Sequence, residues 1–185
     1  TDSVYWGPGW SWDDVPYSFQ PYLSPLMLNR GCVDVTLTPT QKDSLPDVTC
    51  VPASDYYQVD NDAMSFQPEA GKLEVTRNWL HQGNLIHVSG NVSKSITKTL
   101  SINDSKHFFL HTFASRLREK GIEISRTGFG ECPQPDSLTV VSSIYTLKRP
   151  IEEVLKQMMK ESDNLCAESM FYHLASQYAN KKYVG

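Results

Sequence analysis

The chain has 185 residues, of which 39% are hydrophobic and 21% are charged, and this composition is typical of a globular protein with one sizeable core or two small ones. Seventeen Lys and Arg against twenty-one Asp and Glu give a formal charge of −4, with neither sign gathered in a long run, so nucleic acid is not an expected partner. No apolar run reaches the roughly 18 residues of a membrane-spanning helix, so we predict no transmembrane segment in this chain.

The first half of the chain is predicted to be irregular and then all-β. Residues 1–22 are dense in aromatic residues, Pro and Gly, which favours an irregular segment held by large rings. Residues 23–100 show the alternation of strands. Within them, 26–39 are predicted to form two short strands about an Asn-Arg-Gly turn, and 72–92 a hairpin that closes near 82–84.

A helix is predicted where this alternation stops. Asn103 or Asp104 can cap it, and Lys120 followed by Gly121 can end it. The apolar residues that recur at helical spacing, and that we expect on its buried side, are Phe108, Phe109, Phe113 and Leu117.

Two strands and a pair of helices are predicted for the rest of the chain. The strands are 121–128 and 137–147, with prolines between them. Pro150 suits the first turn of a helix that Ser162-Asp163-Asn164 interrupts before a second helix begins. The residues expected to point inward are Ile151, Val154, Leu155, Met158 and Met159, followed by Ala167, Met170, Phe171, Leu174 and Tyr178.

The cysteines and histidines indicate neither a metal nor a cofactor. The four cysteines form no C-x-x-C pair, so we expect ordinary buried or half-buried thiols. A disulfide between Cys32 and Cys50 is the alternative in an oxidising compartment. His107 and His111 lie four residues apart on the predicted helix, but the Glu of an H-E-x-x-H zinc motif is absent between them.

Ser162-Asp163-Asn164 allows two interpretations. Two helices that meet at a Ser-x-Asn hold a hydroxyl and a carboxamide at a fixed separation. The hydroxyl can relay a proton to a leaving amine, and the carboxamide can hydrogen-bond a substrate amide. Ser and Asp are also ordinary helix caps, and these three residues taken alone favour a cap.

The sequence around this motif resembles one family. Residues 150–171, "PIEEVLKQMMKESDNLCAESMF", resemble the class C low-molecular-mass penicillin-binding proteins of the penicillin-binding protein 4 type. These are D-alanyl-D-alanine carboxypeptidases and endopeptidases, and their second motif has the same order of helix, Lys-x-Ser-Asp-Asn and helix. "GPGWSWDDVPYSF", residues 7–19, is similar to a Pro-Gly-Trp, acidic, Phe-Ser segment of that family, and residues 108–128 match one of its helices in pattern.

The resemblance implies an α+β fold in which a β-rich module is nested in an α/β insertion layer, followed by a helical pair of a transpeptidase-like, β-lactamase-like domain. Residues 1–22 and 101–145 would form an outer insertion domain, 23–100 an inner all-β domain, and 146–185 the helical part of the catalytic domain. It also implies a serine peptidase that hydrolyses peptidoglycan stem peptides, is acylated by β-lactam antibiotics, and works in the bacterial periplasm or cell envelope.

Catalysis in this family needs Ser-x-x-Lys, Ser-x-Asn and Lys-Thr-Gly. By the resemblance, Ser162 would relay protons and Asn164 would position the substrate amide. No Lys-Thr-Gly occurs in the sequence. The one Ser-x-x-Lys, residues 95–98, lies in a β-branched stretch, where a strand would place Ser95 and Lys98 on opposite faces. We therefore expect the chain to be an internal fragment that is inactive by itself.

The resemblance also implies a pocket for the free amino end of a diamino-acid side chain. There a carboxylate meets the ammonium and an aromatic ring packs on the methylenes. The positions that match are Asp14 and Phe19, with Trp12 as a wall. The alternative is that Asp13 and Asp14 only solvate a loop whose Trp and Phe belong to the core.

Two hypotheses of other classes stay open. One is a non-catalytic peptidoglycan-binding or scaffolding domain of the same fold. The other is an unrelated α+β domain in which Ser-Asp-Asn is a cap. Flanking Ser-x-x-Lys and Lys-Thr-Gly motifs would favour the enzyme over the first, and the order of strands and helices tests the second.

Overall fold

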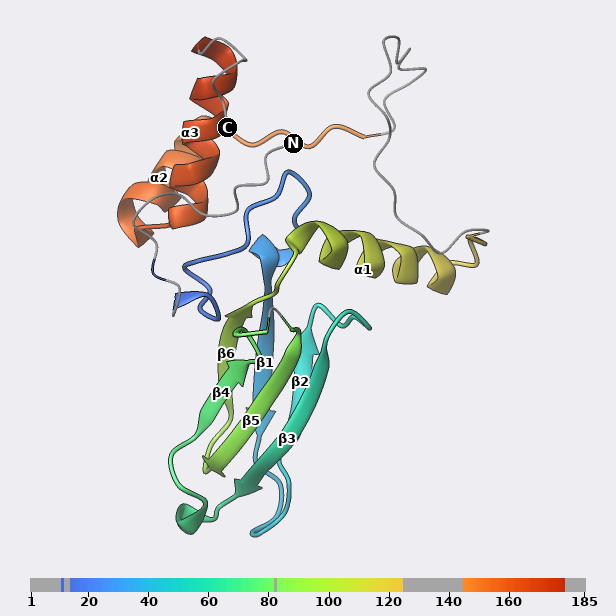
Figure 1. Ribbon diagram of the computed structural model, residues 1–185, viewed down its shortest axis with the longest axis vertical. Helices are drawn as coiled ribbons and strands as arrows, with labels where there is room; N and C mark the ends of the chain where they lie inside the picture. The colour runs from blue at the N-terminus through green and yellow to red at the C-terminus, as the bar shows by residue number, and fades with distance from the viewer. Residues whose placement is uncertain (1–10, 12–13, 82, 125–144, 179–185) are drawn as a thin grey trace. The chain divides into compact units, whose positions relative to one another are not determined.

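The chain divides into two compact units, one within residues 1–123 and the other within 124–184. The first contains six strands and one helix among the residues that are described, and the second contains two helices (Figure 1). The predicted α+β class is confirmed. The part of the chain that the computed structural model describes comprises residues 11, 14–81, 83–124 and 145–178.

The first sheet has β1 (Cys32–Thr38) at its centre. It pairs with β2 (Asp47–Val51) on one side and β6 (Ile96–Ser101) on the other, both antiparallel. Apolar and polar residues alternate along β1, so one face of the strand can be buried while the other meets solvent. The fully buried positions of β1 on the core face are Val33, Val35 and Leu37.

The second sheet has β5 (Leu85–Val92) at its centre. β4 (Glu74–Arg77) pairs with it antiparallel, and this confirms the hairpin predicted for residues 72–92. β3 (Gln58–Ser65) pairs with the other side of β5 in parallel. Every strand found among the described residues of the first unit thus lies between residues 32 and 101, as expected for an all-β middle third.

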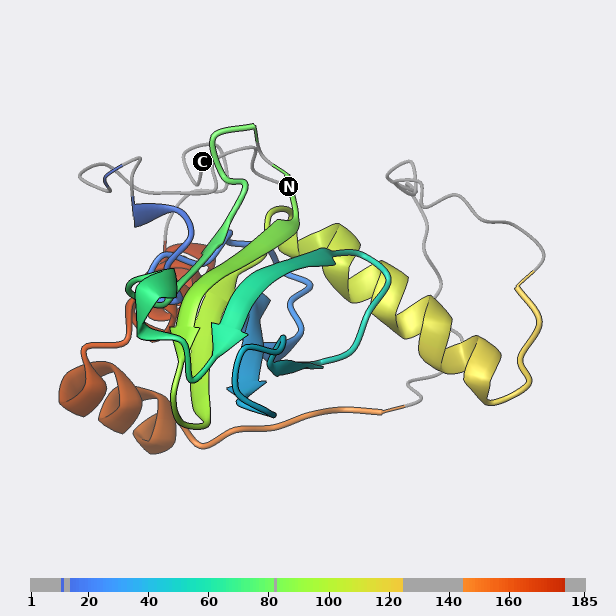
Figure 2. The ribbon, with the colours of Figure 1, turned by 90° about the horizontal axis from the view of Figure 1, so that it is seen from below.

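The two sheets pack face to face and share one hydrophobic core (Figures 1 and 2). Side chains of β1 and β6 meet side chains of β3 and β5 there, and Phe108 of the following helix closes the core at one end. Its ring lies 6.1 Å from that of Tyr56 and 6.2 Å from that of Tyr57. Aromatic pairs at this separation add to the stabilisation from buried apolar area.

α1 (Ser105–Glu119) confirms the helix predicted after Asn103-Asp104. The carboxylate of Asp104 caps it by accepting a hydrogen bond from the backbone nitrogen of His107 at 3.2 Å. Of the four apolar residues expected on its buried side, only Phe108 is fully buried, and Phe113 is exposed. That part of the prediction is wrong because the buried stripe contains mostly small residues. The stripe consists of Ser105, Phe108, Thr112 and Ala114.

The strand predicted before the Asn-Arg-Gly turn is wrong. Residues 26–28 are not in a strand, and Asn29–Gly31 form a short 3-10 segment with positive φ at each residue. This left-handed turn redirects the chain, so only the residues after it enter the sheet. Gly31 is required there, because a Cβ would lie 2.6 Å from the hydroxyl of Ser105.

The strands predicted for residues 121–128 and 137–147 fall largely outside the described residues. Their described ends, 121–124 and 145–147, are not strands. The predictions for the remaining residues of both segments stay predictions.

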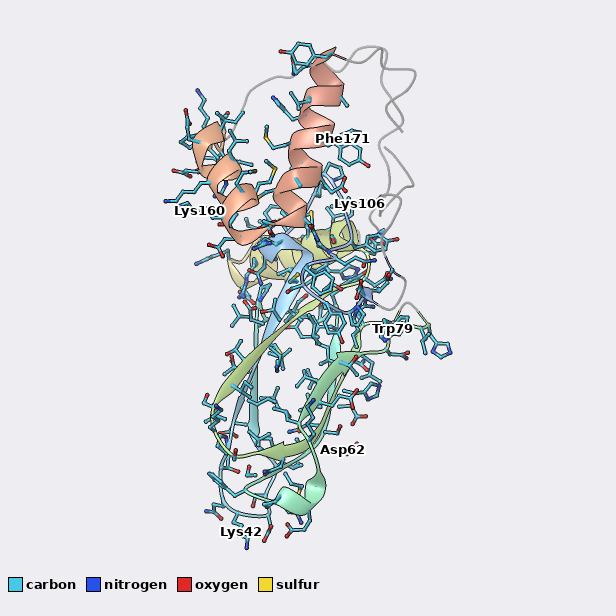
Figure 3. All side chains as sticks on the ribbon, turned by 90° about the vertical axis from the view of Figure 1, so that its left-hand side faces the viewer. Lys42, Asp62, Trp79, Lys106, Lys160 and Phe171 are labelled. Carbon is cyan, nitrogen blue, oxygen red and sulfur yellow. The ribbon has the colours of Figure 1, made fainter. Side chains whose placement is uncertain are left out.

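The second unit contains the predicted helical pair, α2 (Ile151–Glu161) and α3 (Asn164–Tyr178). Neither helix has a buried residue, so the expected inward positions are only partly covered. Met159 is 74% exposed and Phe171 64% exposed, and Phe171 extends from α3 away from α2 (Figure 3). Two helices cover only the sides by which they touch each other. The residues expected inward that are exposed are Ile151, Leu155, Met159, Ala167, Phe171, Leu174 and Tyr178.

Cys32 and Cys50 are not joined by a disulfide, so the disulfide alternative is wrong for the described structure. Cys50 lies opposite Val35 in the register of β1 and β2. Because side chains alternate along a strand, Cys32, three residues from Val35, points to the other face. Burial raises the pKa of the Cys50 thiol, and a hydrogen bond with Tyr57 offsets part of this rise. Within the described ranges we find no helix with the length and apolar character to cross a membrane.

Candidate functional site

Ser162 and Asn164 lie at the junction of α2 and α3. Ser162 follows the last residue of α2 with φ 51° and ψ 44°, the left-handed conformation in which many helices end. α3 begins at Asn164, so only Ser162 and Asp163 separate the two helices. Ser162 is exposed and Asn164 half-buried. Both residues predicted to be catalytic therefore lie at one end of the helical pair.

Asp163, the residue between them, is the helix cap. It is buried, and its Oδ1 accepts a hydrogen bond from the backbone nitrogen of Cys166 at 3.1 Å. Its Oδ2 accepts a hydrogen bond from the side-chain amide of Gln157 in α2 at 3.2 Å. One carboxylate thus starts α3 and ties it to α2. The capping interpretation is correct for Asp163, and it requires no hydroxyl from Ser162.

Residues 14–22, here called the N-terminal segment, are attached to the end of β6. The backbone nitrogen of Ser101 donates to the carbonyl of Pro16 at 3.0 Å, and the Ser101 hydroxyl donates to the carbonyl of Val15. Tyr17 pairs with Leu100 in an isolated β-bridge. The buried residues of this segment are Pro16, Gln20 and Pro21.

Two rings of this segment, those of Tyr17 and Phe19, are exposed. Tyr17 is 52% exposed and Phe19 50% exposed, and they stack with centroids 5.5 Å apart and planes 10° apart. Asp14 is half-buried, and its carbonyl accepts a hydrogen bond from the backbone nitrogen of Tyr17 at 3.0 Å. Asp14 and Phe19 therefore lie on one anchored segment, and Phe19 is not a core residue as the alternative required. Trp12 lies outside the described residues.

Tyr17 was missed by the sequence reasoning. It lies two residues before Phe19, and the spacing of the two aromatics was the only available signal. The stack with Phe19 presents two rings on the segment that begins with Asp14. Such a flat surface suits the methylene groups of a long amino-acid side chain.

The Ser-x-x-Lys sequence lies at the start of β6, as its β-branched neighbours predicted. Ser95 precedes the strand, and its hydroxyl lies 3.4 Å from that of Thr38 on the outer face of the sheet. Lys98 is in register with Val35, whose side chain points to the core face. The amine of Lys98 consequently does not serve the hydroxyl of Ser95.

His107 and His111 face different partners. Nδ1 of His107 lies 2.6 Å from the Asp104 carboxylate, while the ring of His111 lies 5.1 Å from that of Tyr56. Burial, with a contribution from Asp104, raises the pKa of Tyr56 to about 12. Among the residues that the structure describes, no three His, Cys, Asp or Glu side chains are grouped to hold a metal ion.

Comparison with known proteins gives a family and several curated relatives, two of which are described here. The family described as D-Ala-D-Ala carboxypeptidase 3 (S13) matches residues 1–184. Penicillin-sensitive carboxypeptidase A of Dictyostelium discoideum is 21% identical over 184 residues, which cover 90% of this chain and 33% of that protein. D-alanyl-D-alanine carboxypeptidase DacB of Haemophilus influenzae is 25% identical over 179 residues, which cover 93% of this chain and 36% of that protein.

Solved structures share the fold. The crystal structure of penicillin binding protein 4 (dacB) from Haemophilus influenzae matches with a TM-score of 0.68 at 20% identity, over 96% of this chain and 39% of that one. Its complex with a β-lactam matches with a TM-score of 0.62 at 20% identity, over 86% and 36% of the two chains. The chain thus spans about a third of the length of the curated relatives that it matches.

Proposed function

Because the chain belongs to the D-Ala-D-Ala carboxypeptidase 3 (S13) family, we propose that it is an internal part of a serine D-alanyl-D-alanine peptidase. The complete enzyme would hydrolyse peptidoglycan stem peptides through an acyl-enzyme, and β-lactam antibiotics would acylate it. One observation carries this proposal: Ser162 and Asp163 form the two-residue break between two helices, and Asn164 is the first residue of the second helix. Since peptidoglycan is the substrate, the enzyme would work in the bacterial periplasm or cell envelope.

In this proposal the three residues of the motif divide the work. The hydroxyl of Ser162 relays a proton between the nucleophile and the leaving amine, and exposure leaves it open to a substrate. The carboxamide of Asn164 both donates to and accepts from the substrate amide. Asp163 holds both helices and so keeps the spacing of its neighbours constant.

The nucleophile and the third motif would come from other parts of the enzyme. The sequence contains no Lys-Thr-Gly, and the geometry of Ser95 and Lys98 does not suit a nucleophile and its base. The helical pair would be the part of the transpeptidase-like domain that lines the cleft on one side. The chain alone would then have no turnover.

We also propose that Asp14 and Phe19 recognise the free amino end of a diamino-acid side chain. The Asp14 carboxylate would bind the ammonium, and the stacked rings of Phe19 and Tyr17 would cover the methylenes. Trp12 would form a further wall. Anchoring by backbone contacts supports this role, because it fixes the path of the segment that carries these side chains.

The domain boundaries belong to the same proposal. Residues 23–100 would be an inner domain, 1–22 with 101–145 an outer one, and 146–185 part of the catalytic domain. A hydrogen bond of 2.8 Å from the backbone nitrogen of Ile102 to the carbonyl of Gly31 supports an insertion of this kind. It joins a residue near the start of the proposed inner domain to a residue just beyond its proposed end.

The test is intact-mass analysis after incubation with excess penicillin, on this chain and on the full-length product of its gene. We expect one covalent adduct on the full-length protein and none on this chain. Ser162→Ala in the full-length protein should slow acylation about 100-fold or more. Ser169→Ala, on an exposed position of α3, is the matched control and should leave the rate unchanged.

Two results would contradict the proposal. An adduct on this chain would place a nucleophile within it. No adduct on either protein would favour a non-catalytic domain that binds peptidoglycan.

A further inference from the structure

Ser101 lies where three segments of the first unit meet. It is the last residue of β6 and is buried, and all three of its polar groups are engaged. Its backbone nitrogen donates to Pro16 and its hydroxyl to the carbonyl of Val15, while its own carbonyl accepts from Nε of Arg77 at 2.8 Å. The N-terminal segment, β6 and β4 are therefore joined at one residue.

Two of these contacts fix the backbone directly after Asp14. Val15 and Pro16 separate Asp14 from Tyr17, whose exposed ring stacks on Phe19. The bridge between Tyr17 and Leu100 continues the same attachment. The backbone of this segment is thus held by β6. None of the contacts at Ser101 involves the side chains of Asp14, Tyr17 or Phe19.

Arg77 holds Ser101 from the other sheet. It is buried, and its Nη1 donates to the carbonyl of Gly83 at 2.7 Å in addition to the contact with Ser101. Burial lowers the pKa of Arg77 to about 10, so the guanidinium stays protonated at neutral pH. Within the described ranges no carboxylate forms an ion pair with it. Its donors hold two backbone carbonyls in place, which its rigid planar fork can do and a Lys amine cannot.

We propose that Ser101 and Arg77 are positioning residues for the recognition of the diamino-acid ammonium by Asp14, a role that rests on the proposed function. The charge-assisted hydrogen bond between a carboxylate and an ammonium depends on short distance and good geometry, so a small displacement of the segment weakens it. The chemistry of acylation takes place at other residues. Loss of the Ser101 hydroxyl therefore changes which substrate binds, and the rate of the bound substrate stays the same.

The test uses two stem pentapeptides and the full-length protein. One peptide carries the free side-chain amine of its diamino acid, and in the other that amine is acetylated. The ratio of their kcat/KM values measures the recognition of the ammonium. We expect Ser101→Ala to reduce this ratio about three- to tenfold through KM of the free-amine peptide, with kcat nearly constant. Asp14→Asn should abolish the preference.

Thr99→Ala is the matched control. Thr99 carries a hydroxyl on the same strand as Ser101, but that hydroxyl donates to the carboxylate of Asp34 at 2.6 Å and not to the N-terminal segment. It should leave the ratio unchanged. Arg77→Lys removes the contact with the carbonyl of Ser101 and should lower the same kcat/KM ratio. It replaces Ser101→Ala as the test if Ser101→Ala does not fold.

The outcomes separate the two proposals. A wild-type ratio in Ser101→Ala, together with a lost preference in Asp14→Asn, overturns the positioning role and leaves the proposed recognition standing. An equal loss of kcat on both peptides in Ser101→Ala also overturns it, because that pattern indicates a general structural defect. If the wild type does not distinguish the peptides, or Asp14→Asn changes nothing, the proposed recognition fails, and the positioning role with it.

Discussion

Ser162 and Asp163 are neighbours at the junction of α2 and α3, but they differ in burial and in their hydrogen bonds. Asp163 is buried and makes hydrogen bonds to both helices, whereas Ser162 is exposed and has a left-handed backbone that glycine adopts more readily. A side chain that remains at such a position without a packing role indicates a function for its hydroxyl. The two residues should therefore respond in opposite ways to substitution.

Asp163→Ala should destabilise the helical pair by about 1 to 2 kcal/mol, because α3 loses its cap and Gln157 its acceptor. Thermal unfolding followed by circular dichroism measures the change. Asp163→Asn keeps a capping oxygen and serves as the control, with a smaller loss. If alanine and asparagine were equally stable, the carboxylate would not be the cap.

Ser162→Gly should stabilise the helical pair by up to about 1 kcal/mol, because glycine adopts a φ of 51° without steric strain. The same change in the full-length protein should slow acylation as Ser162→Ala does. Ser162→Ala, which keeps the Cβ, is the comparison for stability. A destabilised Ser162→Gly would contradict the idea that the conformation is strained.

At the scale of elements, the local sequence pattern was enough to predict those helices and strands that pack or pair with elements close to them in the sequence. The hairpin of β4 and β5, the helix α1 and the pair α2–α3 were predicted from alternation, helical spacing and caps. β1 pairs with β6, and the hydroxyls of Thr36 and Thr97 form a hydrogen bond of 2.9 Å between these strands. This pairing was not predictable, since no local sequence signal selects a partner strand some sixty residues away.

The candidate site divides in the same way. Ser162, Asn164, Asp14 and Phe19 came from motifs that can be read along the chain. The attachment of the N-terminal segment to Ser101 arises from contacts across the fold, so neither Ser101 nor Arg77 carried a signal in the sequence. The inward sets expected for α1, α2 and α3 were only partly right, because helical spacing identifies an apolar face without showing what covers it.

Gly90 and Gly71 provide a test of how tightly β5 packs against the chain that leads into β4. Both have positive φ, but a Cβ at Gly90 would lie 2.2 Å from the carbonyl oxygen of Lys72, whereas one at Gly71 would meet nothing within 4 Å. Gly71→Ala should cost about 1 to 2 kcal/mol from backbone strain alone, because residues other than glycine rarely adopt φ 85° with ψ −168°. Gly90→Ala should cost about 3 kcal/mol or more, because the backbone must also move. Urea unfolding of the two variants measures both, and similar losses would contradict the close approach.

At the scale of the whole chain, the two units differ in how much they bury. The first has a core shared by two sheets, whereas no residue within α2 or α3 is buried. Isolated helices of 11 and 15 residues are marginally stable in water. Their exposed apolar side chains fit the proposal that further parts of a larger domain cover them.

Hydrogen exchange should reveal this difference. In the chain alone, amides of residues 151–178 should exchange much faster than those of β1 and β5, because local opening of the helical pair exposes little new apolar surface. In the full-length protein the same amides should become protected. Exchange measured by mass spectrometry on both proteins makes the comparison, and equal protection in the two would contradict the proposed larger domain.

The hydrogen bond between Ile102 and Gly31 has a consequence for the ancestry of the molecule. Gly31 and Ile102 lie side by side although some seventy residues separate them in the sequence. The segment between them can therefore be deleted or inserted in evolution without moving the chain before Gly31 or after Ile102. The β-sandwich therefore has the geometry of an inserted domain whose two ends are adjacent. Relatives with a shorter excursion, or a differently folded one, can keep the same host structure, and the sandwich can evolve at its own pace.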